Sequence, residues 1–324
     1  MNNQEILTLA IIIVVVVLLL LISGGVFSYF YTSKIAKRLY KNQWTRNGDY
    51  SFERGCSDAS VDYHLDMFNK GMEYREKNKK YIKEVDLISE GLHLYGEYYD
   101  FGFDKATIVM PGRMETAYYG AFYVDAFKKA GFNVLCTDPR AHGLSEGEFI
   151  TLGKHESLDN IAWAKLLHDK FGVKHINLFG ICGGATCACY VLTNKDCPSY
   201  IDSFISDGMF YSFYVMYKGH IKDEKKPVFP VLQEVFHYIK KYNDVNPYKA
   251  SPKDMLKKIK TPLLMISGEK DKFALPKYAQ KLFDLSISEP KRIEYIPNAR
   301  HSHVRYDNQE AYDKAIYEFL KKIY

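Results

Sequence analysis

The chain contains 324 residues, of which 47% are hydrophobic and 26% are charged, as in ordinary globular proteins. This composition excludes a disordered chain and a collagen-like repeat, and six cysteines in so long a chain exclude a disulfide scaffold. The 44 basic and 39 acidic residues leave a net charge of +5, which is too balanced to indicate a nucleic-acid-binding protein. We therefore expect no nucleic-acid partner.

An uncharged segment near the N-terminus departs from this average. Residues 6–33 carry no charged side chain and include an unbroken aliphatic run from Ile11 to Ile22. About 20 apolar residues are enough for a helix to cross a bilayer. A cleaved signal peptide would have a basic start and a shorter apolar core, whereas residues 1–5 contain no Lys or Arg. We expect a short tail over residues 1–5 and an uncleaved anchor over residues 6–33 that binds the lipid bilayer.

Basic residues flank this segment on one side only. No Lys or Arg precedes it, and the basic residues that follow it are Lys34, Lys37, Arg38, Lys41 and Arg46. The positive-inside rule therefore predicts a single-pass protein of the cell membrane, with the C-terminal bulk on the cytoplasmic side. Free cysteines would persist in that reducing compartment.

The remaining chain divides into a polar connector and one large domain. Residues 34–80 predict a juxtamembrane connector with a helix over residues 60–80, and the domain covers residues 81–324. Within the domain, the predicted strands are residues 84–89, 91–99, 106–110, 133–137, 175–179, 201–206, 263–267 and 292–296. Predicted helices cover residues 117–130, 157–171, 185–193, 276–285 and 309–322. This alternation indicates an α/β fold, with a mostly parallel sheet of eight strands and helices on both faces.

One region interrupts the alternation. Residues 208–260 contain no convincing strand, are rich in Tyr, Phe, Lys and Pro, and have a helical pattern over residues 230–241. Ligands of open α/β sheets bind at the carboxyl ends of the strands. A helical insertion above that edge predicts a lid over a binding site.

The strand over residues 175–179 leads into Gly180-Ile181-Cys182-Gly183-Gly184 and then into a helix. Glycines two residues before and after a central residue, between a strand and a helix, form the nucleophile-elbow pattern G-x-S-x-G, here with Cys182 in place of serine. Small flanking residues let this sharp turn close. A cysteine at a helix N-terminus is favoured as the thiolate, which is the nucleophilic form. The alternative is that Cys182 is a small buried cysteine in a protein that descends from a serine hydrolase and has lost its catalytic activity.

An acid and a base are expected after later strands. Asp271 follows the strand over residues 263–267, and we prefer it to Glu269 in the same turn and to Asp207 after the preceding strand. His301 follows the last strand, and we prefer it to His303. Such a histidine takes the proton of the nucleophile and later activates water. The chain order of nucleophile, acid and base differs from the orders in chymotrypsin and subtilisin.

The other cysteines carry no recognisable chemistry. Cys187 and Cys189 follow Cys182 on the same helix at spacings that match no zinc site, and they are interpreted as packing residues. The same interpretation applies to Cys56, Cys136 and Cys197. The sequence has no metal, nucleotide or flavin motif, and we expect no cofactor.

Five segments in order resemble the α/β-hydrolase family: residues 110–113, 138–145, 180–184, 268–271 and 299–302. The chain is most similar to membrane-anchored bacterial members near the serine aminopeptidase and monoglyceride-lipase-like hydrolases. The resemblance implies an oxyanion hole formed by the amide of Gly183 and that of Arg113 or Met114. It also implies that the loop over residues 138–145 is scaffold beside the pocket, with His142 in a structural role.

The cysteine in the elbow leaves three functions open. Cys182, His301 and Asp271 could cleave an ester, thioester or amide bond of a small acyl substrate. Family members with a cysteine nucleophile include dienelactone hydrolases and polyhydroxyalkanoate synthases, and Gly-Ile-Cys-Gly-Gly is similar to the synthase motif. An acyltransferase or polyester synthase using the same thiolate is therefore the second hypothesis. A catalytically inactive, membrane-tethered binding protein is the third.

Overall fold

The computed structural model describes residues 2–46 and 54–324. Its centre is a sheet of eight strands in the order β1-β2-β4-β3-β5-β6-β7-β8. Strand β2 pairs antiparallel with β1 and β4, and the other neighbours pair in parallel. The strands are β1 Ile82–Ser89, β2 Leu92–Tyr99, β3 Lys105–Met110, β4 Asn133–Thr137, β5 His175–Ile181, β6 Ile201–Asp207, β7 Leu263–Gly268 and β8 Lys291–Ile296. The mostly parallel eight-stranded sheet predicted from the sequence is confirmed.

Helices cover both faces of the sheet. Because side chains alternate along a strand, Leu178 and Phe179 of β5 enter two different cores. Leu178 packs in the core covered by α5 (Glu156–Phe171), α6 (Gly183–Thr193) and α10 (Pro276–Leu285). Phe179 packs in the opposite core, under the helices α2 (Asp62–Lys77), α4 (Val124–Lys129) and α12 (Gln309–Ile323). This two-sided burial explains why the inner strands are apolar runs without polar alternation.

The lid contains two helices more than predicted. After β6 the chain forms α7 (Phe213–Asp223), α8 (Val228–Tyr242) and the short α9 (Pro252–Met255) before it returns to β7. Helices α7 and α8 pack against each other around Phe213, Tyr217 and Phe236. The expected helix over residues 230–241 lies within α8, whereas α7 and the short α9 were not predicted.

The predicted helix over residues 117–130 is not continuous. It is divided into α3 (Ala117–Gly120), a single 3-10 turn (Ala121–Tyr123) and α4. Gly120 lies so close to β4 that a Cβ atom there would be 2.7 Å from Sγ of Cys136. The segment therefore bends where its backbone touches the sheet. The remaining short elements are a 3-10 turn at Lys79–Tyr81 and α11 (Val304–Asp307).

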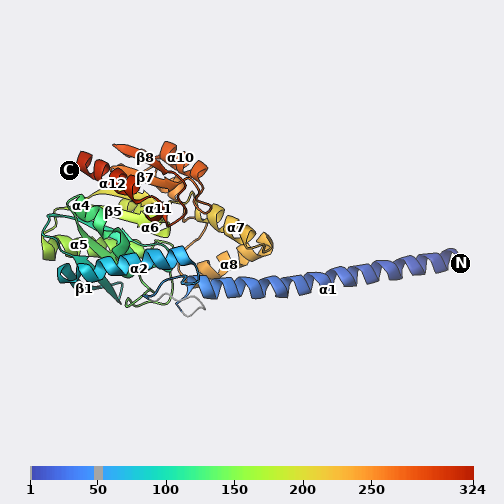
Figure 1. The fold of residues 1–324 in the computed structure, drawn as a ribbon. Coiled ribbons are helices and arrows are strands. Elements are labelled where there is room, and N and C mark those ends of the chain that lie inside the picture. The colour runs from blue at the N-terminus through green and yellow to red at the C-terminus, as the bar shows by residue number, and fades with distance from the viewer. Residues whose placement is uncertain (1, 47–53) are drawn as a thin grey trace.

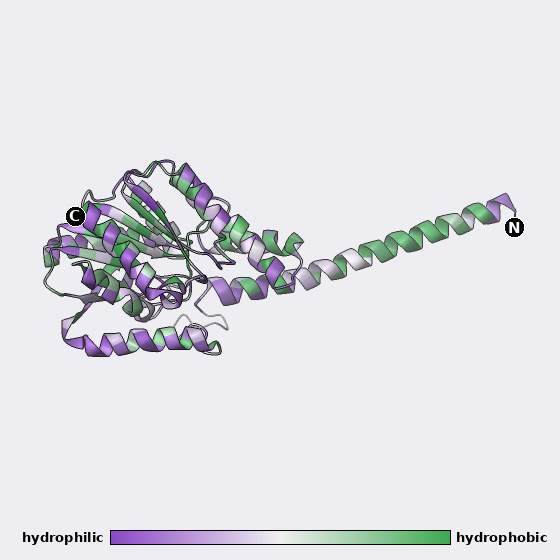
Figure 2. Cartoon of the chain, turned by 45° about the horizontal axis from the view of Figure 1, so that its top comes forward, coloured by the Kyte–Doolittle hydropathy of each residue, from purple (hydrophilic) through white to green (hydrophobic). Residues whose placement is uncertain are grey.

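Helix α1 (Asn3–Trp44) is 42 residues long and projects away from the sheet (Figure 1). Asn2 caps it by accepting hydrogen bonds from the backbone amides of Gln4 and Glu5, and the Glu5 carboxylate accepts from the Asn2 amide. The apolar residues between Ile6 and Tyr31 are exposed, and Figure 2 shows this part as a mostly hydrophobic rod. By length and composition, α1 is able to cross a membrane.

The same helix continues past the expected boundary at residue 34 without a break. Its last three turns are buried against α8, through side chains that include Ala36, Leu39 and Trp44. The hydroxyl of Tyr40 donates to Oδ1 of Asn243 at 2.7 Å, at the end of α8. The first part of the expected connector is thus a helix packed on the lid, and its second part contains α2, within the predicted residues 60–80.

Candidate active site

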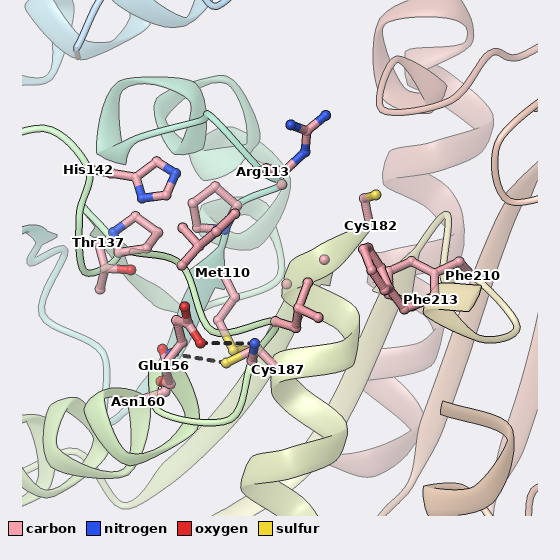
Figure 3. A pocket seen from close by; sticks show the side chains of 18 of the residues that line it. Met110, Arg113, Thr137, His142, Glu156, Asn160, Cys182, Cys187, Phe210 and Phe213 are labelled. Carbon is pink, nitrogen blue, oxygen red and sulfur yellow. Dashed lines mark hydrogen bonds between the residues drawn. The ribbon is translucent and has the colours of Figure 1, made fainter. Parts of the chain in front are cut away.

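Cys182 occupies the sharp turn between β5 and α6 (Figure 3). Its φ of 51° and ψ of −106° are strained for a residue with a side chain. Both flanking glycines are required by close contacts. A Cβ on Gly180 would lie 2.5 Å from Cα of Ala185, and one on Gly184 would lie 2.0 Å from the carbonyl oxygen of Met110. The structure therefore has the nucleophile-elbow geometry that the glycine spacing predicts.

The predicted acid and base lie together beside Cys182. Asp271 follows β7 and His301 follows β8, and Oδ2 of Asp271 is 2.6 Å from Nδ1 of His301. The other oxygen of Asp271 accepts hydrogen bonds from the amides of Phe273 at 2.8 Å and Ala274 at 2.7 Å. These bonds fix the carboxylate in the orientation that holds the imidazole.

The electrostatic environment of His301 favours its protonated form. Burial opposes the charge, but the interactions with Cys182 and Asp271, including hydrogen bonds to both, raise the pKa of His301 well above its ordinary value. A histidine of raised pKa next to a thiol is suited to take the thiol proton and form a thiolate–imidazolium pair.

The two alternative candidates make other contacts. The Asp207 carboxylate lies at the end of β6 and accepts a hydrogen bond from the hydroxyl of Tyr312 at 2.8 Å. Burial raises the pKa of Asp207 to about 7. The ring of His303 stacks edge-on against His64, with 4.2 Å between ring centroids, and its Nδ1 is 2.8 Å from the carbonyl oxygen of His301. The structure thus brings His301 and Asp271 together as a pair, and it gives His303 a contact with the His301 backbone.

The predicted oxyanion-hole residues differ in their partners. Gly183 is the first residue of α6, so its amide lies at a helix N-terminus. The amide of Met114 donates to Nε2 of His142 at 3.2 Å, and Nδ1 of His142 is 2.9 Å from the carbonyl oxygen of Arg140. Burial lowers the pKa of His142 to about 4, so the ring is neutral at pH 7. The amide of Met114 thus donates to His142, and the second donor stays a prediction between Arg113 and Met114.

A buried carboxyl group that the sequence analysis missed supports the same loop. Oε2 of Glu115 accepts a hydrogen bond from the amide of Gly112 at 2.8 Å. A Cβ on Gly112 would lie 2.9 Å from that oxygen, so the glycine lets the carboxyl group approach. Burial raises the pKa of Glu115 to about 7. A single Glu in a loop gave no signal of this role.

This environment predicts a pH-dependent stability effect. The unfolded chain releases the Glu115 proton near its ordinary pKa of 4.5, whereas the folded chain holds it until about pH 7. The folded state therefore binds more protons in this window, and the contribution of Glu115 to stability falls as pH rises. As the pH is raised from 4.5 to 7, we expect the free energy of unfolding of Glu115→Gln to increase by about 3 kcal/mol relative to that of the wild type. Chemical denaturation at each pH measures the difference in unfolding free energy between the variant and the wild type. Glu76→Gln, on the exposed face of α2, is the control, for which we expect no such change with pH.

A largely apolar cavity of about 110 Å³ opens beside Cys182, and Figure 3 shows many of the side chains that line it. Its walls come from the elbow, the loop over residues 110–113, α5, the lid and the end of α1. The side chains nearest the lid are those of Phe210, Phe213 and Met216, and Trp44 of α1 joins them. The lid therefore covers the site, as its position in the sequence predicts, but Trp44 was assigned to the connector.

In the described parts of the chain, 2–46 and 54–324, no group of three or more His, Cys, Asp or Glu side chains could hold a metal ion. Cys187 lines the cavity and Cys189 packs in the core under α6, and burial raises the pKa of both thiols. Neither thiol has the environment of a nucleophile.

The sequence family described as alpha/beta hydrolase fold matches residues 108–266, which include the elbow and the strands on either side of it. The chain has the fold of the α/β-hydrolase family. The family expected from the five ordered segments is confirmed, and it supports the expectation that the chain is a hydrolase.

The proteins to which this chain is similar include two enzymes of the same fold and one uncharacterised protein. An esterase of Pyrococcus furiosus superposes with a TM-score of 0.63 at 24% identity, covering 76% of this chain and 93% of that one. An acylaminoacyl peptidase of Pyrococcus horikoshii superposes with a TM-score of 0.55 at 16% identity, covering 74% of this chain and 40% of that one. The uncharacterised protein YqkD of Bacillus subtilis is 27% identical over 201 residues, which are 61% of this chain and 65% of that protein, less than two thirds of its length.

Proposed function

We propose that this α/β hydrolase cleaves the ester, thioester or amide bond of a small acyl substrate through a covalent intermediate on Cys182. The contact that supports the proposal most strongly is the arrangement of His301 between Cys182 and Asp271. A thiol in an elbow, a histidine of raised pKa and a carboxylate that orients it are the parts that nucleophilic acyl transfer requires.

The first half of the reaction forms a thioester. His301 accepts the thiol proton of Cys182, and the thiolate sulfur attacks the carbonyl carbon of the substrate. The resulting oxyanion accepts hydrogen bonds from the amide of Gly183 and from that of Arg113 or Met114. The bond to the leaving group then breaks, and the leaving group takes the proton from His301.

The second half releases the acid. His301 accepts a proton from a water molecule while the water oxygen attacks the thioester carbon. The carbon–sulfur bond breaks, the carboxylic acid leaves, and the proton returns to Cys182. If an alcohol, thiol or amine takes the place of water, the same intermediate gives acyl transfer.

We further propose that α1 anchors the enzyme to the cell membrane through residues 6–33. The exposure of its apolar side chains supports this role, since about 20 such residues favour a bilayer over water. The basic residues after the segment support a cytoplasmic hydrolase domain.

Trapping of the intermediate tests the proposed reaction. The purified full-length protein, in detergent micelles, is mixed with nitrophenyl esters and acyl thioesters of different chain lengths, quenched in acid and analysed by mass spectrometry. We expect an acyl adduct on the peptide that contains Cys182, and release of the free acid. When a primary alcohol or amine is added as an acceptor, formation of its acyl derivative without free acid would instead assign an acyltransferase. Absence of both the adduct and turnover with every substrate would contradict the proposal.

A further inference from the structure

The end of α1, the proposed membrane anchor, forms a wall of the cavity beside Cys182. Trp44, the last residue of α1, lines this cavity together with Cys182 and Gly183. Its side chain is only 2% exposed. The indole packs edge-on against Phe213 of the lid, with 5.1 Å between ring centroids, and against Tyr217 at 5.7 Å. Trp44 therefore closes a gap between the elbow and the lid.

A hydrogen bond from Asn243 and a cation–π contact with Arg113 hold Trp44 in that position. The carbonyl oxygen of Trp44 accepts a hydrogen bond from Nδ2 of Asn243 at 3.3 Å. The same Nδ2 also donates to the carbonyl oxygen of Ile150 at 2.9 Å. The guanidinium of Arg113 lies 5.3 Å from the centroid of the indole ring, within the range of a cation–π interaction. Nη1 of Arg113 also donates to the carbonyl oxygen of Gln43 at 3.3 Å. The end of α1 is thus tied directly to the loop of the proposed oxyanion hole.

The location of the cavity indicates which part of a substrate it receives. In the proposed reaction His301 protonates the leaving group, so the leaving group must lie on the His301 side of Cys182. The cavity is lined by Gly183 and Arg113, and neither His301 nor Asp271 is among the residues that line it. It therefore lies on the side of the acyl group.

From these contacts, which depend on the proposed function, we infer that Trp44 of the anchor helix determines acyl-chain specificity. The indole forms the end of an apolar acyl-binding site and limits the length of chain that fits. The membrane helix is accordingly part of the substrate-binding site as well as a tether.

Activity against a series of acyl chains tests this inference in the full-length protein. One extra methylene in an apolar pocket changes kcat/KM by about tenfold or more. We expect Trp44→Ala to raise the ratio of kcat/KM for octanoyl over butanoyl nitrophenyl esters by at least about tenfold, and Trp44→Phe to raise it less. Trp44→Phe keeps an aromatic ring in place if Trp44→Ala folds poorly.

The matched control is Leu39→Ala. Leu39 is buried on the same helix and packs in the same core with α8, but it does not line the cavity. Loosening the packing of α1 without altering the cavity should leave the chain-length ratio unchanged. An equal shift in Leu39→Ala and Trp44→Ala would assign Trp44 a structural role only and overturn the inference.

A second measurement does not require turnover, so it separates this inference from the proposed function. The rate of alkylation of Cys182 by N-methylmaleimide and N-octylmaleimide is followed by peptide mass spectrometry. We expect Trp44→Ala to raise the octyl rate relative to the methyl rate by about tenfold. If no ester or thioester is cleaved but this ratio rises, the cavity wall is confirmed and the proposed function fails. A ratio that is unchanged in both Trp44 variants overturns the inference, whether or not the protein cleaves any substrate.

Discussion

Replacement of Cys182 by alanine is expected to lower kcat at least about a thousandfold on any substrate that the wild type cleaves. Without the sulfur no thioester forms, and the oxyanion donors and the cavity retain only the catalysis that binding and charge stabilisation provide. The side chain is small and only partly buried in a turn, so the loss is expected without unfolding.

Cys197→Ala is the matched control for the loss of a thiol. Cys197 is also partly buried, but it lies in the loop before β6, and burial raises its pKa to about 11. Its replacement should leave kcat/KM within about twofold of the wild type, as expected for a site away from the chemistry. Retention of activity in Cys182→Ala, measured by initial rates on the best substrate of the panel, would rule out Cys182 as nucleophile.

Asp271→Asn is expected to reduce kcat by about ten-thousandfold while the protein stays folded. The carboxylate accepts the hydrogen of Nδ1 of His301 and stabilises the imidazolium that forms when Cys182 loses its proton. An amide supplies no charge, and it can present its NH₂ group to the ring and select the wrong tautomer. The loss should appear in kcat across the whole pH range from 6 to 9.

Asp207→Asn distinguishes the two carboxyl groups. With a pKa raised to about 7, Asp207 is substantially protonated in the folded enzyme, and asparagine resembles that neutral form. Its hydrogen bond with Tyr312 can be preserved by the amide oxygen. We therefore expect a change of less than about tenfold in kcat. A larger loss in Asp207→Asn than in Asp271→Asn would transfer the orienting role to Asp207.

The sheet and the elbow were predictable because their signals are local. Buried parallel strands are short apolar runs, and each run in this chain coincides with a strand to within a few residues. The elbow needs glycines at Gly180 and Gly184, for which the structure leaves no room for a Cβ atom. The pairing of Asp271 with His301 followed from the family order of the motifs rather than from any contact visible in the sequence.

The parts that were missed depend on contacts between distant segments. Helix α7 was missed because its many aromatic residues hide the pattern. Its buried residues Phe213, Tyr217 and Ile221 nevertheless have helical spacing, which could have been used to predict the helix. The same is true of Ala36, Tyr40 and Trp44 at the end of α1, whose polar neighbours suggested a connector instead. No pattern along the chain could indicate that Trp44 reaches the cavity, since that contact depends on how α8 folds back on α1.

The continuous helix from the apolar segment to Trp44 has a consequence for the distance between Cys182 and a membrane surface. Trp44 lies eleven residues after Ser33, and at 1.5 Å per residue this is about 16 Å of helix. With residues 6–33 in a bilayer, the packing of the end of α1 against the lid and the cavity would hold Cys182 at a nearly fixed distance from the lipid surface. Substrates would then be selected by where their acyl bond lies above the membrane as well as by their shape. A membrane-bound substrate whose scissile bond lies at this distance above the lipid surface would reach the enzyme by diffusion in two dimensions. A substrate whose bond lies deep among the lipid chains would not reach it.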